Sequence, residues 1–256
     1  MKRLRTFGLL AAVAAALTAC NRSSGGGSGS NGNNPPVVNP GGPESFAPKG
    51  SSPPVVVTFN IAFAENVPMP ALQAMATKFE TVNESLWSVT EGQIRIGRIR
   101  ITDNAHPGSK SDSYNDLNLS AQDIVVWAPA NFNGPGIAYV LVGAGRYGRF
   151  MGIPSSIANT TLMHELGHFL FELSWAVAPV LVDEYAEKPD DLACMMELTY
   201  TPLQWCSPGN HESQPGQPHS CWTQILIDYP DFRYMNQNVA SPPTPPAPIV
   251  EYTDIP

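Results

Sequence analysis

The pattern of apolar and polar positions predicts a strand, a helix and a second strand at the start of the folded region. The continuous apolar run VVVTFNIAF at residues 55–63 indicates a buried strand. Residues 68–88 carry apolar side chains at helical spacing and begin with prolines, which a helix accepts in its first turn. In QIRIGRIRIT, apolar and basic residues alternate over residues 94–102, as in a half-exposed strand.

Two more short apolar runs precede a second helix. DIVVWAP at residues 123–129 and IAYVLVG at residues 137–143 indicate strands, and a glycine-rich stretch follows the second run. Residues 160–173, TTLMHELGHFLFEL, place apolar side chains between polar ones in a way that buries one helix face in a core. The order of these elements predicts an α/β fold with one mixed sheet.

The second helix carries the motif with the clearest chemistry, HELGH. His164 and His168 are four residues apart, so both imidazoles lie on one helix face and reach one metal ion. Imidazole suits zinc, and a catalytic zinc ion has three protein ligands and one position for water. Glu165 reaches that water without being a ligand and is the predicted general base. The sequence therefore predicts a zinc-dependent peptide hydrolase.

The first residues read as an export signal. Three basic residues precede the apolar run at residues 7–18, which is too short to span a bilayer. The run ends in Leu-Thr-Ala-Cys, which resembles a bacterial lipobox with Cys20 as the lipidated residue. Residues 1–20 are thus predicted to be a lipoprotein signal peptide, and the alternative is an ordinary secretory signal cleaved near Ala19. Either reading predicts that the chain leaves the cytoplasm, and the lipid anchor predicts a location in the bacterial cell envelope, periplasmic or at the cell surface.

Composition divides the rest of the chain. Residues 21–54 are rich in Gly, Ser, Asn and Pro and predict a flexible linker. Residues 55–240 are long enough for one domain with its own core. Residues 241–256 are rich in proline, which excludes a helix or a central strand and leaves a tail or an extension along a sheet edge.

The charge of the chain limits its partners. The signal peptide contains three of the 14 basic residues and none of the 22 acidic ones, so the mature chain has a net charge near −11. This balance disfavours binding to nucleic acid and to anionic membrane surfaces. A peptide or protein substrate is the expected partner, and the membrane is reached through the lipid on Cys20.

The third zinc ligand does not follow the usual metzincin spacing. That spacing has a glycine three residues after the second histidine and a ligand six residues after it. Phe171 and Ser174 occupy these positions here.

Downstream residues carry a family resemblance. After SWAVAPVL the chain reads Val-Asp-Glu-Tyr at residues 182–185. HELGH followed by this run resembles the metallopeptidase-like N-terminal domain of the calcium-activated chloride channel regulator family and its bacterial relatives. Further pieces follow in the family's order: CMM at residues 194–196, WC at 205–206, Asn210-His211 and SCW at 220–222.

The resemblance implies a metzincin-like metallopeptidase domain with His164, His168 and Asp183 as zinc ligands. It also implies that Met195 and Met196 form an apolar floor below the metal, and the alternative is that they are ordinary core methionines. SWAVAPVL reads as an insertion relative to the family, and Glu172 stands where the family has a turn glycine.

Other third ligands stay open. Glu187 lies near the spacing of the glutamate ligand in thermolysin-like enzymes, and Glu184 and Glu172 are weaker candidates. Residues 138–143 are a candidate edge strand for pairing with an extended substrate, and the alternative is an interior strand.

Three cysteines remain in the domain besides Cys20. In an exported protein a disulfide is expected, and Cys206–Cys221, which would close a loop-rich segment, is the expected pair, which leaves Cys194 unassigned. Zinc binding by these thiols is the alternative, although the chain has no CxxC spacing.

Two other functions compete with an active endopeptidase. If the insertion displaces the third ligand, the domain is a surface binding module that keeps the fold and has lost turnover. A self-processing domain, which cleaves only its own chain, is the other alternative.

Overall fold

The computed structural model describes ten stretches of the chain. They are residues 53–105, 121–127, 138–142, 149–173, 175–177, 180–182, 194–196, 204–209, 220–233 and 243–253. The predicted signal peptide and almost all of the predicted linker lie outside these residues. No helix within the described stretches combines the length and the apolar character needed to cross a bilayer.

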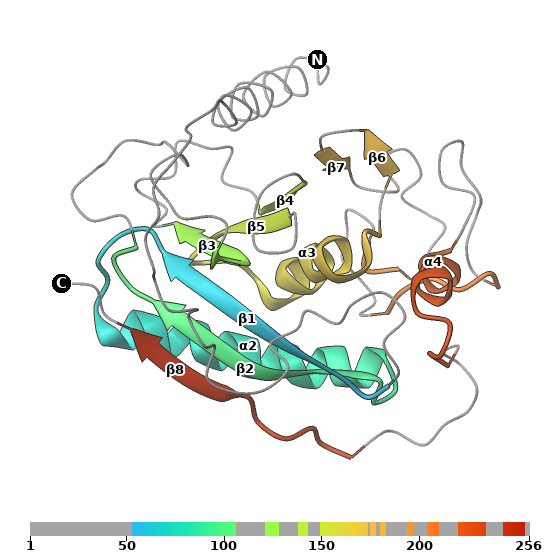
Figure 1. The fold of residues 1–256 in the computed structure, drawn as a ribbon, viewed down its shortest axis with the longest axis horizontal. Coiled ribbons are helices and arrows are strands. Elements are labelled where there is room, and N and C mark those ends of the chain that lie inside the picture. Colours follow the sequence, from blue (N-terminus) through green and yellow to red (C-terminus); the bar gives the residue numbers. More distant parts are fainter. Residues whose placement is uncertain are drawn as a thin grey trace, which may run out of the picture.

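The strands of the described residues form one mixed sheet in the order β6-β7-β4-β5-β3-β1-β2-β8 (Figure 1). Strands β5, β3, β1, β2 and β8 pair in parallel, whereas β4 is antiparallel to β5 and to β7, and β6 is antiparallel to β7. The strands are β1 (Val55–Phe63), β2 (Ile94–Thr102), β3 (Ile124–Trp127), β4 (Tyr139–Val142), β5 (Arg149–Pro154), β6 (Trp175–Val177), β7 (Val180–Val182) and β8 (Ile249–Thr253). The predicted α/β fold with a mixed sheet is confirmed.

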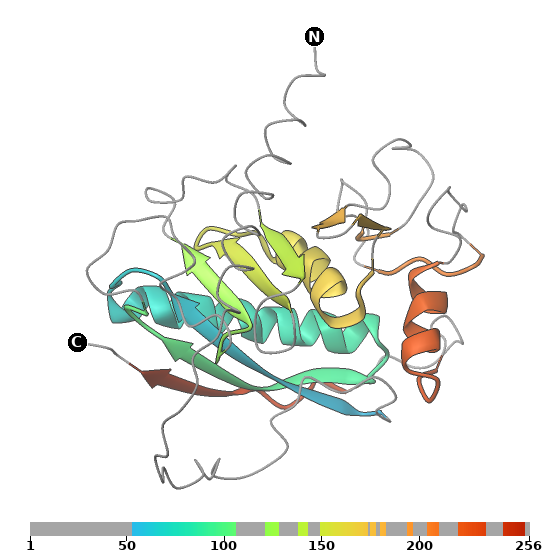
Figure 2. The same cartoon turned by 45° about the horizontal axis from the view of Figure 1, so that its top comes forward.

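Two helices pack together on the sheet (Figures 1 and 2). Helix α2 (Met69–Val89) connects the parallel strands β1 and β2, and α3 (Asn159–Phe171) follows β5. Phe59 of β1 joins them, because its ring centroid lies 5.9 Å from that of Phe79 on α2 and 6.0 Å from that of Phe169 on α3. The shorter helix α4 (Cys221–Asp228) lies beyond the end of α3.

The alternation of β2 changes phase at a β-bulge. Val57 pairs with Ile96 and Thr58 pairs with Arg98, so Gly97 is an extra residue on β2. The bulge lets Ile96 and Ile99 both face the core, although three positions separate them. A Cβ at residue 97 would lie 2.3 Å from Cγ1 of Val56, which explains the glycine.

The side chain of Asn83 on α2 provides a hydrogen-bond acceptor for β2 next to the bulge. Its Oδ1 accepts a hydrogen bond from the backbone N–H of Ile96 at 2.6 Å, and its Nδ2 donates to the carbonyl oxygen of Pro246 at 3.2 Å. Asn83 is 1 % exposed. One buried amide therefore ties α2 both to the bulged strand and to the segment that leads into β8.

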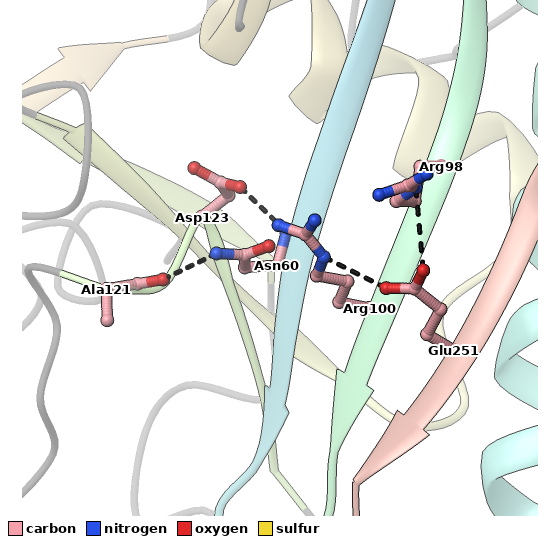
Figure 3. Close-up of polar contacts among 6 residues, drawn as sticks. All are labelled: Asn60, Arg98, Arg100, Ala121, Asp123 and Glu251. Carbon is pink, nitrogen blue, oxygen red and sulfur yellow. Dashed lines mark hydrogen bonds and ion pairs between the residues drawn. The ribbon is translucent and has the colours of Figure 1, made fainter. Parts of the chain in front are cut away.

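Polar side chains join neighbouring strands on either side of β1 and β2 (Figure 3). Glu251 on β8 makes ion pairs with Arg100 at 3.0 Å and with Arg98 at 3.6 Å, both on the half-exposed face of β2. On the other side, the N–H of Asn60 donates to Oδ2 of Asp123 at 2.7 Å, and Nδ2 of Asn60 donates to the carbonyl of Ala121 at 2.9 Å.

The prediction that residues 138–143 form a free sheet edge is wrong. Strand β4 lies between β5 and β7, and Leu141 pairs with Val180. The insertion SWAVAPVL supplies β6 and all of β7 except Val182, and the two strands form an antiparallel hairpin beside β4. Backbone groups of β4 that an extended substrate would use are thus partly taken by the chain itself.

The sheet also extends past residue 240, the predicted end of the domain. Strand β8 lies in the proline-rich segment and pairs in parallel with β2 from Arg98↔Ile249 to Thr102↔Thr253. Strand β8 is the last strand in the sheet order, so the second alternative, an extension along a sheet edge, is the one observed. An edge position is where a proline-rich segment can join a sheet. The prolines precede the strand, whose own sequence is IVEYT.

The glycine-rich stretch before α3 contains a strand that the sequence pattern did not indicate. Strand β5 pairs with both β3 and β4, and its Gly152 lies opposite Tyr139. A Cβ at Gly152 would lie 2.3 Å from Cζ of Tyr139, so the tyrosine ring occupies the space of the missing side chain. Glycine in this strand reflects close packing rather than a loop.

We predict that Asn83→Leu destabilises the fold by about 2 kcal/mol, because it leaves the buried N–H of Ile96 without its acceptor. Urea denaturation measures the loss. Glu84→Leu, at the neighbouring exposed position of the same helix, is the control and should change stability by less than about 0.5 kcal/mol. Equal effects of the two changes would contradict this role of Asn83.

Candidate metal centre

Helix α3 buries the whole HELGH motif. It starts just after β5, where Nζ of Lys78 on α2 donates a 2.6 Å hydrogen bond to the carbonyl of Ile157. Every residue from Leu162 to Phe171 is buried. The side chains of His164, Glu165 and His168 therefore lie inside the protein, with relative exposures of 1, 6 and 3 %. Burial of three ionisable side chains within five residues is unusual outside a functional site.

The two imidazoles converge through their Nε2 atoms. Nε2 of His164 lies 3.0 Å from Nε2 of His168, and the rings are nearly perpendicular, at 82°. The spacing of four residues on α3 produces this contact, as the motif predicts. The predicted convergence of His164 and His168 is present in the structure.

Backbone carbonyls hold the other nitrogen of each ring. Nδ1 of His164 donates to the carbonyl oxygen of Met195 at 2.8 Å, and Nδ1 of His168 donates to that of Leu173 at 2.5 Å. A carbonyl oxygen only accepts hydrogen bonds, so each Nδ1 carries the proton. In neutral imidazoles both Nε2 atoms then present lone pairs to each other at 3.0 Å. That contact is repulsive unless a cation, either a metal ion or an added proton, lies between the two nitrogens.

A left-handed residue ends α3 and brings the carbonyl of Leu173 to His168. Glu172 has φ 54° and ψ 29°, its N–H bonds to the carbonyl of His168, and the N–H of Leu173 bonds to that of Gly167. This is the turn that glycine usually makes at a helix end. Glu172 thus makes, without glycine, a left-handed turn of the kind that glycine usually makes.

Arg149 holds Glu172 in place. Nη1 of Arg149 on β5 lies 2.7 Å from Oε1 of Glu172, and the arginine side chain is only 8 % exposed. The carboxylate is therefore already paired with an arginine, which makes Glu172 a weaker candidate for the third ligand. Burial raises the pKa of the neighbouring Tyr229 to about 12, against the opposing charge of Arg149, so this phenol stays neutral at physiological pH.

Gly167, the fourth residue of HELGH, allows close packing beneath the helix. A Cβ there would lie 2.5 Å from Sδ of Met196 and 3.3 Å from Nε1 of Trp205. Met195 and Met196 are both fully buried, and Met196 packs against the helix at Gly167. The close approach also brings the carbonyl of Met195 within reach of His164.

The remaining predicted ligands are not placed. Asp183 directly follows the last residue of β7, and it lies outside the described residues, as do Glu184 and Glu187. The expected Cys206–Cys221 disulfide is not formed in the described structure. Instead the Sγ atoms of Cys194, Cys206 and Cys221 all lie within 4.8 Å of one another.

Sequence reasoning missed the two carbonyl partners of the histidines. Backbone oxygens carry no residue-type signal, so only the turn at Glu172 and the proximity of Met195 to α3 reveal them. The CMM segment indicates only that Met195 lies near the histidines. Its resemblance to the family concerns the apolar side chains, whereas the group that contacts His164 is the backbone carbonyl of Met195.

Comparison of the chain with protein-family models, with curated proteins and with solved structures found no match.

We predict that Glu172→Gly is more stable than Glu172→Ala by about 1 kcal/mol, because only alanine retains the left-handed strain. Both changes remove the ion pair with Arg149, so the comparison isolates the backbone. Urea denaturation measures the difference.

The matched control is the exposed helix position Glu84, where alanine should be more stable than glycine by about 1 kcal/mol. The same order at both positions would contradict the left-handed turn at Glu172.

Proposed function

We propose that this protein is an exported, lipid-anchored zinc metalloendopeptidase with a metzincin-like domain. One observation carries the proposal: two buried imidazoles face each other through Nε2 atoms 3.0 Å apart while carbonyl oxygens hold both Nδ1 atoms. Carbonyl partners on the non-ligating nitrogen are typical of histidines that bind metal, since they fix the tautomer and the ring orientation.

The donor set fits zinc. Two nitrogen ligands of one tetrahedral zinc ion lie about 3.3 Å apart, because each Zn–N bond is about 2.0–2.1 Å long. The Nε2 atoms of His164 and His168 are close to that separation before any metal is bound. The two rings are therefore preorganised. A metal ion should bind them more tightly than it would bind two freely rotating imidazoles, because less conformational entropy is lost.

The third ligand in the proposal is Asp183, which the resemblance to the chloride channel regulator family suggests. The ion pair between Glu172 and Arg149 supports this choice, because Glu172 would have to leave that partner to bind the metal. Glu187 and Glu184 stay as alternatives. The hairpin β6–β7 also supports a retained site, because pairing with β4 accommodates the insertion within the sheet.

Glu165 is the proposed general base. It follows His164 on the helix and is 6 % exposed, so its carboxylate lies in surroundings that exclude most water. It accepts a proton from the attacking water and passes it to the leaving amine. Zinc, when bound, would polarise the scissile carbonyl and lower the pKa of a coordinated water.

Export and the lipid anchor on Cys20 rest on residues 1–20 alone: a basic start, a short apolar run and the lipobox-like ending. Labelling with a radioactive fatty acid, and its loss in Cys20→Ser, tests the anchor separately from the metal site.

We predict that Glu165→Gln lowers peptide hydrolysis at least about 100-fold while the chain keeps its zinc, because a general base contributes to rate rather than to binding. The full chain, purified without chelator and supplied with zinc, is tested on a peptide library, with cleavage followed by mass spectrometry. Zinc is measured by elemental analysis in the same samples.

The double change His164→Ala/His168→Ala is the control for the site and should lose about one zinc ion relative to the unchanged chain. Separate Asp183→Ala and Glu187→Ala variants identify the third ligand by which one weakens zinc binding. Unchanged cleavage by Glu165→Gln would contradict its role as base. Zinc binding without cleavage of any peptide would instead favour the surface binding module, and cleavage of the chain's own sequence alone would favour self-processing.

A further inference from the structure

Three buried cysteines from separate segments of the described chain lie close together. Cys194 precedes the two buried methionines, Cys206 follows Trp205, and Cys221 is the first residue of α4. Their relative exposures are 0, 0 and 2 %. All three Sγ atoms lie within 4.8 Å of one another, and those of Cys194 and Cys221 are 3.7 Å apart.

We propose that these three thiolates bind a second metal ion, a soft divalent cation of the zinc type. Two sulfur ligands of one tetrahedral zinc ion lie about 3.8 Å apart, because each Zn–S bond is about 2.3 Å long. The Cys194–Cys221 separation of 3.7 Å matches this value. A disulfide needs two sulfurs about 2.05 Å apart and uses only two of the three.

Backbone amides around the cluster favour the charged form of the sulfurs. The N–H of Cys206 donates to Sγ of Cys194 at 3.3 Å, and the N–H of Cys221 donates to Sγ of Cys206 at 3.2 Å. Hydrogen bonds donated to a thiolate stabilise its negative charge, and metal binding requires the thiolate. Two of the three sulfurs thus have a donor already in place.

The N-terminus of α4 also favours the thiolate form of Cys221, the third cysteine of the cluster. Cys221 is the first residue of the helix, where the positive end of the helix dipole favours a thiolate. Ser220 caps the helix by accepting a hydrogen bond from the N–H of Thr223 at 3.2 Å. The cap fixes where the helix begins and so fixes the position of Cys221.

The cluster connects directly to the histidine pair. Cys194 is bonded to Met195, whose carbonyl holds Nδ1 of His164. The N–H of Met195 donates to the carbonyl of Gln204 at 2.7 Å, and the N–H of Trp222 donates to that of Cys206 at 3.1 Å. A metal ion on the three sulfurs would cross-link these short segments and hold the Met195 carbonyl in position. The second site is structural and does not depend on hydrolytic activity.

The test uses the variant His164→Ala/His168→Ala of the full chain, in which the histidine site is removed. It should still bind about one zinc ion per chain. After exchange of zinc for cobalt, it should show the near-ultraviolet charge-transfer absorption of cobalt bound to thiolate, a signal that histidine ligands do not give. This measurement changes no buried cysteine and therefore does not risk unfolding the cluster.

A further variant adds Cys206→Ser to the histidine changes and should lose both the bound ion and the cobalt–thiolate absorption. Cys20→Ser in the same background alters a cysteine outside the cluster and should keep both. A folded histidine variant that binds no metal, or whose mass shows a disulfide among the three cysteines, would overturn the proposal. All these measurements are made in a chain that already lacks His164 and His168. Their outcome therefore does not depend on whether the histidine site binds zinc or hydrolyses peptides, and the two proposals can fail separately.

Discussion

The arrangement of the two imidazoles depends on a pair of hydrogen bonds from ring nitrogens to backbone carbonyls. With Nδ1 of His164 on Met195 and Nδ1 of His168 on Leu173, neither ring is free to rotate, and both Nε2 lone pairs point inward. A different structural feature places each carbonyl oxygen beside its histidine. The left-handed turn at Glu172 supplies one, and the tight contact at Gly167 supplies the other. Neither feature involves the side chain of His164 or His168, yet both determine how the two imidazoles are oriented.

The sheet and α2 provide the rigid base for these features. Phe59 contacts a ring on each helix, so α3 is positioned against α2 as well as against the strands. Arg149 at the start of β5 reaches the far end of α3 through Glu172. The helix is thereby held near both ends, and a helix held in this way keeps side-chain positions to the small tolerances that a metal site needs.

Local patterns in the sequence were sufficient for β1, α2, β2 and the histidine pair, because each rests on a period or a spacing within a few residues. The structure differs where contacts between distant segments decide the outcome. The phase change of β2 depends on Gly97 and on Asn83 of α2, and β5 contains glycine because Tyr139 covers it. The insertion pairs with β4, and β8 pairs with β2, through backbone groups that have no sequence signature. The cysteine cluster belongs to the same class, since its members come from three segments and lack the short spacing of familiar zinc motifs.

The position of β8 has a consequence for how the chain folds. Glu251 pairs with Arg100 across a separation of 151 positions, so the outer edge of β2 stays open until residues 249–253 have been made and have reached the sheet. Long-range parallel pairing of this kind is slow, and an open strand edge invites pairing with other chains in the meantime. The basic side chains of Arg98 and Arg100 lie along that edge and repel a second copy of the same strand. The charges that later anchor β8 thus also protect the unfinished sheet.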